Sequence, residues 1–342
     1  MPETTPTPQH NPEHAPTQVE QRAMDLATSE AVAIPTQASS REEVVAAGDG
    51  LLSAEEARSL ASDAWHELRR NAFFVVSAIL IVLLILIAAF PGMFTTTDPR
   101  DANLKDHYLG APQWSHFFQA DWFGYDGQGH SIYSRVIYGA RASIIVGIVT
   151  TAFVAVLGTL IGMLAGYFGG WIDAVLSRVV DIFFAIPLLL GALVIMQAIK
   201  DRNEWTVVLA LGALGWTQIA RIMRGSVMQV KNADYVTAAR ALGASTWRIL
   251  WKHIMPNAIA PVIVVSTISL GVFISSEATL SFLGIGLQEP TVSWGLDISS
   301  AGDVLRDAPH AVFFPSAFLS ITVLSFIMLG DAVRDALDPK LR

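Results

Sequence analysis

Six long apolar segments alternate with polar segments after the first seventy residues. They cover residues 72–90, 142–168, 182–199, 205–220, 254–276 and 311–330. A helix needs about 20 residues to cross the ~30 Å hydrocarbon layer of a bilayer, and the shortest segment reaches this length with its flanks. Backbone groups find no water in that layer, so the segments that cross it must be helical. The pattern predicts an all-α membrane protein with six transmembrane helices.

The remaining segments suggest a division of the chain. Residues 1–50 are rich in Pro, Thr, Gln, Glu and Ala and have few large apolar groups, which predicts a disordered tail. Ser53 and Glu56 form a capping box, and apolar residues then recur every three or four positions, so residues 51–71 are predicted to lie as an amphipathic helix in the membrane interface. The first span occupies 72–90, a loop 91–141, and a core domain with five spans 142–342.

Helix packing and bending can also be expected from the spans. Gly158, Gly162 and Gly166 are spaced by four residues, which suits close packing against another helix of the bundle. Pro187 and Pro261 are expected to kink their helices, because proline lacks the backbone N–H that a helix needs.

Composition and charge agree with a membrane protein and indicate its orientation. Only 15% of residues are charged, against about a quarter in soluble domains. Nearly all of the net charge of −8 lies in the first seventy residues, which hold twelve acidic and five basic side chains. With both termini inside, the inner segments carry twelve Lys and Arg and the outer segments seven. The positive-inside rule therefore predicts cytoplasmic termini, an extracytoplasmic loop 91–141 and a cytoplasmic segment 221–253.

The basic stretch 221–257 lies between two apolar segments. It carries six Lys or Arg and one acid, Asp234. Asn232 is predicted to cap a helix that starts at Ala233, and Gly243 to end it, because glycine tolerates the left-handed conformation at a C-terminal cap. Ser245 is predicted to cap a second short helix that Pro256 ends.

The first of these helices has a surface suited to a partner protein. Four small side chains, Ala238, Ala239, Ala241 and Ala244, would let another protein approach the backbone closely. The bulkier Tyr235 and Leu242 would fill pockets on that partner.

This stretch resembles the cytoplasmic "EAA" loop of ABC importer permeases. The pattern is carried by Thr237-Ala238-Ala239, by Gly243, and by Ile254-Met255-Pro256, with Thr237 in place of the usual Glu. The surrounding residues are similar to the dipeptide, oligopeptide and nickel branch. The resemblance implies a type I ABC importer permease bundle in which the loop is a coupling helix. The residues implied to couple to the ATPase are Tyr235, Thr237, Ala238, Ala239, Arg240, Leu242, Gly243 and Ala244.

The same resemblance implies the protein's partners. They are a sister permease in a heterodimer, two ABC ATPase subunits, an extracytoplasmic solute-binding protein and the lipid bilayer of the plasma membrane; nucleic acid is not among them. Peptides are the commonest cargo in the branch, and nickel, haem and glutathione remain open.

Three further stretches fit this branch. Residues 122–141 are similar to its signature before the second span, with Tyr125 and His130-Ser131 replacing the usual residues. There, Asp126 and His130 suggest either a metal pair or, as we prefer, a polar turn. Glu277 ends the fifth span, where an acid is costly; it either lines the translocation path or bonds to the following loop. The C-terminal stretch 330–342 resembles the family's terminal sequence.

Other function classes are less well supported. No Gly is followed by Lys, so the phosphate-binding P-loop is absent and any ATPase activity belongs to a separate chain. This chain is therefore expected not to be an enzyme and to need no cofactor or metal. The alternative is an ion-coupled secondary transporter or channel, for which Glu277 is the one charged candidate. A membrane-embedded hydrolase would need converging His, Asp or Ser groups, and no His lies within an apolar segment.

Overall fold

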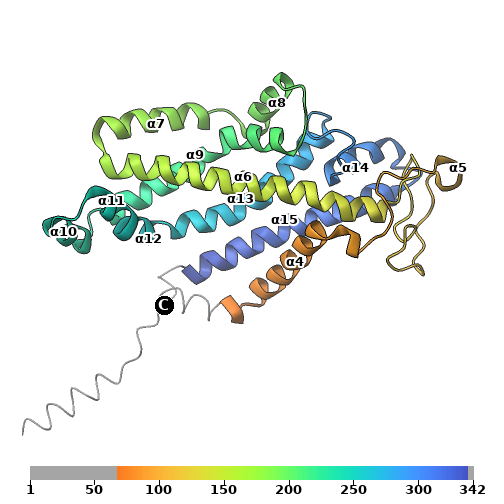
Figure 1. Cartoon of the computed structure of the whole chain (residues 1–342), viewed down its shortest axis with the longest axis horizontal. Coiled ribbons are helices and arrows are strands. Elements are labelled where there is room, and N and C mark those ends of the chain that lie inside the picture. The colour runs from red at the N-terminus through yellow and green to blue at the C-terminus, as the bar shows by residue number, and fades with distance from the viewer. Residues whose placement is uncertain (1–67, 338–342) are drawn as a thin grey trace, which may run out of the picture. The chain divides into compact units, whose positions relative to one another are not determined.

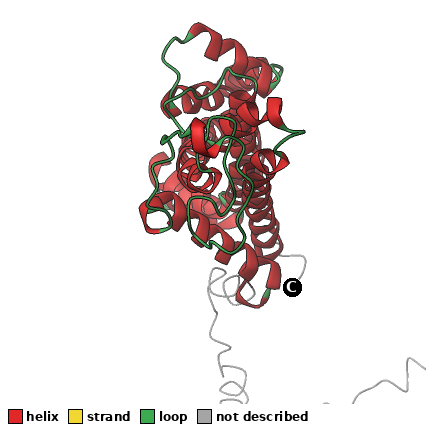
Figure 2. Cartoon of the chain, turned by 90° about the vertical axis from the view of Figure 1, so that its right-hand side faces the viewer, coloured by secondary structure: helices red, strands yellow, loops and turns green. Residues whose placement is uncertain are grey.

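Long helices packed side by side form most of the structure, a computed structural model that describes residues 68–337 (Figure 1). The helices are α4 (Ala72–Ala89), η1 (Pro91–Met93), α5 (Leu104–His107), α6 (Ile132–Phe168), α7 (Gly170–Phe184), α8 (Leu188–Ala198), α9 (Glu204–Val230), α10 (Asp234–Ala241), α11 (Thr246–Ile249), η2 (Leu250–Ile254), α12 (Met255–Ala258), α13 (Ala260–Phe282), α14 (Trp294–Ala301), η3 (Gly302–Val304) and α15 (Pro309–Leu337). Figure 2 shows helices and loops and, within residues 68–337, no strand. The predicted tail 1–50, the capping box Ser53 and Glu56 with most of the predicted interfacial helix 51–71, and residues 338–342 lie outside the described residues.

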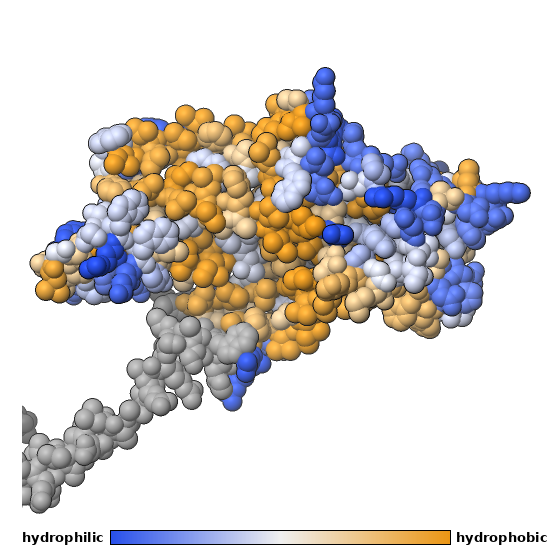
Figure 3. Space-filling view, in the orientation of Figure 1, coloured by the Kyte–Doolittle hydropathy of each residue, from blue (hydrophilic) through white to orange (hydrophobic). Residues whose placement is uncertain are grey.

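The predicted spans correspond to helices of suitable length. Within the described residues, α4, α6, α9, α13 and α15 are long and apolar enough to cross a membrane. The pair α7 and α8 makes a sixth span if the two are counted together. Figure 3 shows apolar side chains around the middle of the bundle and hydrophilic ones at both ends. The prediction of an all-α membrane bundle is confirmed.

The third span, predicted as a kinked helix over residues 182–199, is broken into two helices. The chain bends by 82° between α7 and α8, at the three residues before Leu188. Pro187 lies at this break and has no N–H to continue the helix, and it disfavours helical backbone at Ile186. The kink expected at Pro187 is therefore present. Pro261 lies in the first turn of α13, just after the helix is interrupted at Ile259 between α12 and α13; a kink at Pro261 stays a prediction.

The helix of the second span begins earlier than the predicted boundary at residue 141. Helix α6 starts at Ile132, and the Ser131 side chain caps it by accepting a hydrogen bond from the backbone N–H of Ser134. The ten residues before Ala142 are thus the first turns of α6, although they fall within the predicted loop 91–141. At 37 residues α6 is longer than a span requires, so the membrane boundary near residue 141 stays a prediction.

Two apolar cores hold the bundle together, and α6 contributes to both. One core joins α6, α8, α9 and α13 to the segment from α10 to α12. The other joins α4, α14 and α15 to the first half of α6. The segment from α10 to α12 lies at one end of the bundle, and α5 and α14 lie at the other (Figure 1). The start of α4 and the end of α15 point toward the end that holds α10 (Figure 1).

Candidate functional site

Helix α10 ends in a hydrogen-bonded turn centred on Gly243. The N–H of Gly243 donates to the carbonyl of Arg240, and the N–H of Ala244 donates to the carbonyl of Ala239. Gly243 has φ +79°, in the left-handed region. These two bonds and this conformation make a Schellman cap, which satisfies the last carbonyls of the helix. The predicted C-terminal role of Gly243 is confirmed.

The start of α10 differs from the prediction. Ala233 occupies the N-cap position and supplies no side-chain hydrogen bond. The predicted cap Asn232 instead donates its side-chain amide toward the carbonyl of Met228, one turn back in α9. Asn232 follows α9 by two residues, so its side chain is within reach of that helix end, and the cap prediction was wrong.

One face of α10 is exposed and the other is fixed to the bundle. Tyr235 is 46% exposed and Leu242 is 88% exposed, and the side chains of Thr237, Ala238 and Arg240 are exposed as well. Val236 is fully buried, and Ala239 and Ala244 are half-buried beside it. Of the eight predicted coupling residues, six therefore face outward, and the two half-buried alanines set how closely α10 approaches the bundle.

The buried face of α10 joins it to the core of the bundle. Val236 belongs to the apolar core that also contains Val227 of α9, together with Ile249, Leu250 and Ile254 of the segment after α10. All five side chains are 2% exposed or less. Because close-packed interiors transmit displacement, α10 is positioned to move together with the ends of α9 and α13.

The second short helix does not stop at Pro256. The chain runs from α11 through a π-helical turn, η2, into α12, with Pro256 in the first turn of α12. In a π turn each N–H bonds to the carbonyl five residues back instead of four. This shift in the bonding pattern just before Pro256 lets the chain continue as a helix although proline has no N–H. Ser245 is at the N-cap position of α11 as predicted, although its side chain makes no capping bond. The expected stop at Pro256 was wrong.

Helix α9 packs closely against α6 along the predicted glycine series. A Cβ at Gly158 would lie 2.7 Å from the carbonyl oxygen of Trp216, and a Cβ at Gly166 would lie 2.9 Å from that of Arg224. A Cβ at Gly162 would meet the carbonyl oxygen of Ala220. These contacts confirm that the glycines let two helix backbones approach each other.

Three charged side chains of the predicted loop bind neighbouring helices. Lys231 donates to the carbonyl of Gly166 at 2.7 Å, near the end of α6, where a cation is favoured by the helix dipole. Arg224 forms a two-pronged ion pair with Asp173 of α7, with N–O distances of 2.6 and 2.7 Å. The basic residues of the loop therefore tie α9 to α6 and α7. No local sequence pattern predicts these pairs, because their partners lie more than fifty residues away.

A second ion pair, formed by the third of these side chains, lies further along α7. Arg221 donates to Asp181 at 2.7 Å, and its guanidinium group lies 3.8 Å from the ring centre of Phe184. Asp181 is half-exposed, so this pair contributes little to stability by itself.

The comparisons with known proteins agree with this geometry. The family model described as "Binding-protein-dependent transport system inner membrane component" matches residues 158–342, more than half of the chain and including all of α9 to α12. This chain belongs to that family. A second model, the "N-terminal TM domain of oligopeptide transport permease C", matches residues 59–112. The chain is thus a multi-pass inner membrane permease subunit of an ABC importer, which confirms the predicted family.

Relatives align over most of the chain. The oligopeptide transport system permease protein of Bacillus subtilis is 39% identical over 304 residues, covering 86% of this chain and 95% of the relative. The dipeptide transport system permease protein of Alkalihalophilus pseudofirmus is 36% identical, covering 82% and 90%. The glutathione transport system permease protein of Pectobacterium atrosepticum is 35% identical, covering 81% and 90%.

Glu277 of this permease lies inside its own subunit. The carboxylate is fully buried and accepts hydrogen bonds from Ser143 of α6 at 2.7 Å and from Ser281 at 2.9 Å. The Ser281 hydroxyl accepts in turn from the backbone N–H of Leu287 in the loop after α13. This arrangement favours the second of the two roles considered for Glu277, a bond to the following loop. A role in the translocation path stays a prediction.

The outer turn of the permease is held by Asp126. Its carboxylate accepts from the backbone N–H groups of Gln128 and His130 at 2.8 Å and bonds the His130 ring at 2.9 Å. Burial by itself raises the pKa of Asp126, but the hydrogen bonds from His130 and Gln128 outweigh it, so the pKa lies below its usual value. Within residues 68–337 no third His, Asp or Glu joins the pair in a metal-binding group. The geometry favours the polar turn.

Sequence reasoning missed one buried ion pair of the permease. Arg135 of α6 donates to Asp297 of α14 at 2.6 and 2.7 Å, and both side chains are less than 10% exposed. The pair fixes α14 against the first turns of α6. Arg135 was noticed only as one basic residue of the loop 91–141, because nothing near it in the sequence indicates a partner 162 residues away.

Proposed function

We propose that α10 is the coupling helix of this permease and docks into a separate ATPase subunit. The observation that supports this is the combination of an exposed outer face, with Tyr235, Ala238 and Leu242, and a buried inner face at Val236. A helix built this way can receive a partner on one side and pass its movement to the bundle on the other. Its outer residues, including Thr237 and Arg240, would contact the ATPase directly.

The mechanical path runs from α10 into two spans. Val236 shares one apolar core with Leu250 and Ile254, which lead toward α13, and with Val227, which belongs to α9. The close backbone contact at Gly162 then joins α9 to α6. Movement of α10 would therefore displace three membrane helices together. The bend at Pro187 gives α8 freedom to move separately from α7.

ATP supplies the driving force through partner chains. Two ATPase subunits that close on ATP would bind one state of the permease better than the other, and only this difference in binding can shift its conformation. In this proposal the end of the bundle with α10 faces the cytoplasm, so both termini are cytoplasmic. A sister permease completes the pore, and an extracytoplasmic solute-binding protein delivers the cargo to the opposite end.

We propose peptides as the cargo. The three relatives are named for oligopeptide, dipeptide and glutathione transport, and glutathione is itself a short peptide. Their shared substrate class is thus a small molecule with amide bonds and charged ends. The proposal extends this class to the present permease.

The coupling proposal is tested with two variants of the loop. Gly243→Pro removes the N–H that donates to Arg240 and cannot adopt φ +79°, so the Schellman cap is lost. Ala238→Trp leaves the fold intact, because Ala238 is exposed, but places a large ring on the docking face. Both variants are expected to abolish uptake and to separate ATP hydrolysis from transport in proteoliposomes that contain the whole transporter.

A matched control distinguishes docking from bulk. Ile79→Trp adds the same ring to an exposed position on α4, away from α10 and from the end of the bundle that receives the binding protein, and normal uptake is expected. Ala239→Trp reports on the half-buried face, where overpacking would also lift α10 from the bundle. Normal transport by Gly243→Pro and Ala238→Trp together would overturn the coupling role of α10.

A further inference from the structure

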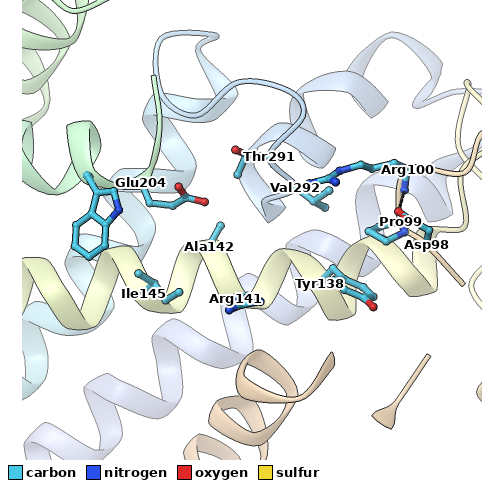
Figure 4. Close-up of a pocket in the computed structure, with 11 residues that line it drawn as sticks. Asp98, Pro99, Arg100, Tyr138, Arg141, Ala142, Ile145, Glu204, Thr291 and Val292 are labelled. Atoms are coloured by element: carbon cyan, nitrogen blue, oxygen red, sulfur yellow. Dashed lines mark hydrogen bonds between the residues drawn. The ribbon is translucent and has the colours of Figure 1, made fainter. Parts of the chain in front are cut away.

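A pocket of about 480 Å³ opens at the end of the bundle opposite α10 (Figure 4). It lies between the first turns of α6 and α9 and two loops, one around Arg100 and one around Thr291 (Figure 4). This volume is within the range of about 300–1,000 Å³ that is usual for small-molecule sites. Nothing in the coupling function requires a pocket here.

Charges of both signs line the pocket in equal number. Arg100 and Arg141 supply two positive charges, and Asp98 and Glu204 supply two negative charges. The pocket is therefore neutral as a whole but has charged groups on different elements. A ligand that matches it is also neutral as a whole and carries separated charges.

Two of these four charged groups are already in use. The Asp98 carboxylate accepts from the backbone N–H of Arg100 at 2.9 Å, and the Arg100 Nε donates to the carbonyl of Pro290 at 3.1 Å. The first bond shapes the loop around Arg100, and the second joins it to the loop around Thr291. Asp98 and Arg100 thus shape the pocket as well as charging it.

The other two charged groups have no partner within residues 68–337. Neither the Arg141 guanidinium nor the Glu204 carboxylate forms a hydrogen bond or ion pair with a described residue. Arg141 comes from α6 and Glu204 from the start of α9, and the Glu204 carboxylate projects into the space beside Thr291 (Figure 4). An unpaired cation and an unpaired anion in one pocket favour a ligand that supplies both counter-charges.

We propose that this pocket binds the charged ends of a short peptide, with its carboxylate on Arg141 and its ammonium group on Glu204. The proposal rests on the proposed function, because it assumes that the transporter imports peptides. A peptide with free ends is a zwitterion, and a dipeptide spans at most about 7 Å in extended form. Tyr138 and Trp205 line the same pocket and give apolar surface to the side chains. The permease itself then selects for free peptide ends, in addition to the binding protein.

The position of the pocket suits cargo that arrives from outside. Arg141 directly precedes the apolar segment that starts at Ala142, so the pocket lies where α6 enters the hydrocarbon layer. Cargo held there has left the water but has not yet passed between the apolar helices.

Uptake by the complete transporter in proteoliposomes tests the proposal. The substrates are dialanine, dialanine amide and N-acetyl-dialanine. Arg141→Gln is expected to slow uptake of dialanine about tenfold, the typical loss when a charged hydrogen bond is removed, but to change uptake of the amide by less than twofold. Glu204→Gln is expected to slow dialanine equally and to leave N-acetyl-dialanine unchanged.

Each variant is compared with wild type on the same substrate, so any preference of the binding protein cancels. Arg306→Gln and Asp303→Asn remove one exposed charge each outside the pocket, and each is expected to affect free and capped peptides equally. A capped peptide that is not imported at all would leave no uptake to compare. In that case calorimetry measures the affinity of dialanine for the assembled transporter without its binding protein. This affinity is expected to fall about tenfold in both pocket variants.

The outcomes separate the two proposals. Failure of wild type to accumulate any peptide overturns the peptide cargo and the pocket with it. Normal peptide import with equal losses for free and capped peptides, or with no loss in either pocket variant, overturns the pocket alone.

Discussion

Replacing Gly162 by Ala tests whether the α6–α9 contact holds the bundle together. The new Cβ would lie 2.9 Å from the Cβ of Met223 and 3.0 Å from the backbone nitrogen of Arg224, and it would meet the carbonyl oxygen of Ala220. Two of these three atoms belong to the backbone of α9, so no side-chain rotation relieves the contact. To make room for the new methyl group, α6 and α9 must therefore move apart where they pack against each other.

The magnitude follows from two opposing effects. Overpacking of a close-packed interior costs about 1–3 kcal/mol. Ala is a better helix former than Gly by about 1 kcal/mol, which offsets part of this cost. We therefore expect Gly162→Ala to destabilise the permease by up to about 2 kcal/mol relative to wild type, and by about 1–3 kcal/mol relative to an alanine that gains helix propensity without overpacking. Gly225, in α9, provides the matched control, because a Cβ there meets nothing within 4 Å and only the helix-propensity gain applies.

Thermal unfolding of the purified permease in detergent measures both variants. A change of 1 kcal/mol moves Tm by about 2–4 °C in a domain of 150–250 residues and by no more in a longer chain, so Gly162→Ala is expected to lower Tm by up to about 8 °C relative to wild type. Gly225→Ala is expected to keep or raise Tm. All scans use one heating rate, because membrane proteins often unfold irreversibly. A Tm for Gly162→Ala equal to or above that of Gly225→Ala would refute the argument that backbone contact at this position holds α6 against α9.

Three further predictions concern single sites. Arg135→Gln leaves Asp297 buried without its cation and is expected to cost about 3–5 kcal/mol in unfolding free energy; the double variant Arg135→Met, Asp297→Leu is expected to recover most of this, and an unrecovered double variant would contradict it. The Cβ of Gly243→Ala would meet no atom within 4 Å, but alanine is strained at φ +79°, so we expect the free energy of unfolding to fall by about 1 kcal/mol, seen as a lower Tm. Uptake should be retained by this variant, whereas Gly243→Pro should abolish it. The lowered pKa of Asp126 gives stability that is present above the unfolded value of about 3.9 and is lost as pH falls through the folded value; the Tm difference between wild type and Asp126→Asn should therefore shrink below about pH 4, and a constant difference would exclude this role.

Local chemistry carried most of what the sequence could predict. The six apolar segments located the spans because a bilayer demands about twenty apolar residues from any crossing helix. Gly243 was identifiable as a helix end because few other residues adopt φ +79° without strain. The four-residue spacing of Gly158, Gly162 and Gly166 indicated close packing, although not that α9 is the partner.

The wrong predictions concern residues that can take more than one structural role in the same local sequence. Asn232 could cap α10 or bond back to α9, and the tertiary position of the α9 end decided between them. Pro256 could stop a helix or begin a new turn, and the π turn before it made the second possible. Distant pairs such as Arg224 with Asp173 depend on the arrangement of whole helices, so a single sequence gives no signal for them.

Helix α6 connects the two proposed sites of the permease. With 37 residues it is about 55 Å long, enough to pass through the whole bundle. Lys231 binds α6 near the end that holds α10. Arg141, which we propose binds the peptide carboxylate, lies in the first third of α6, toward the other end. A rigid helix transmits a tilt at one end as a displacement at the other. Movement of α10 would therefore shift Arg141 on α6 and Glu204 on α9 together, relative to the pocket loops around Arg100 and Thr291, weakening the hold on a peptide when the ATPases close.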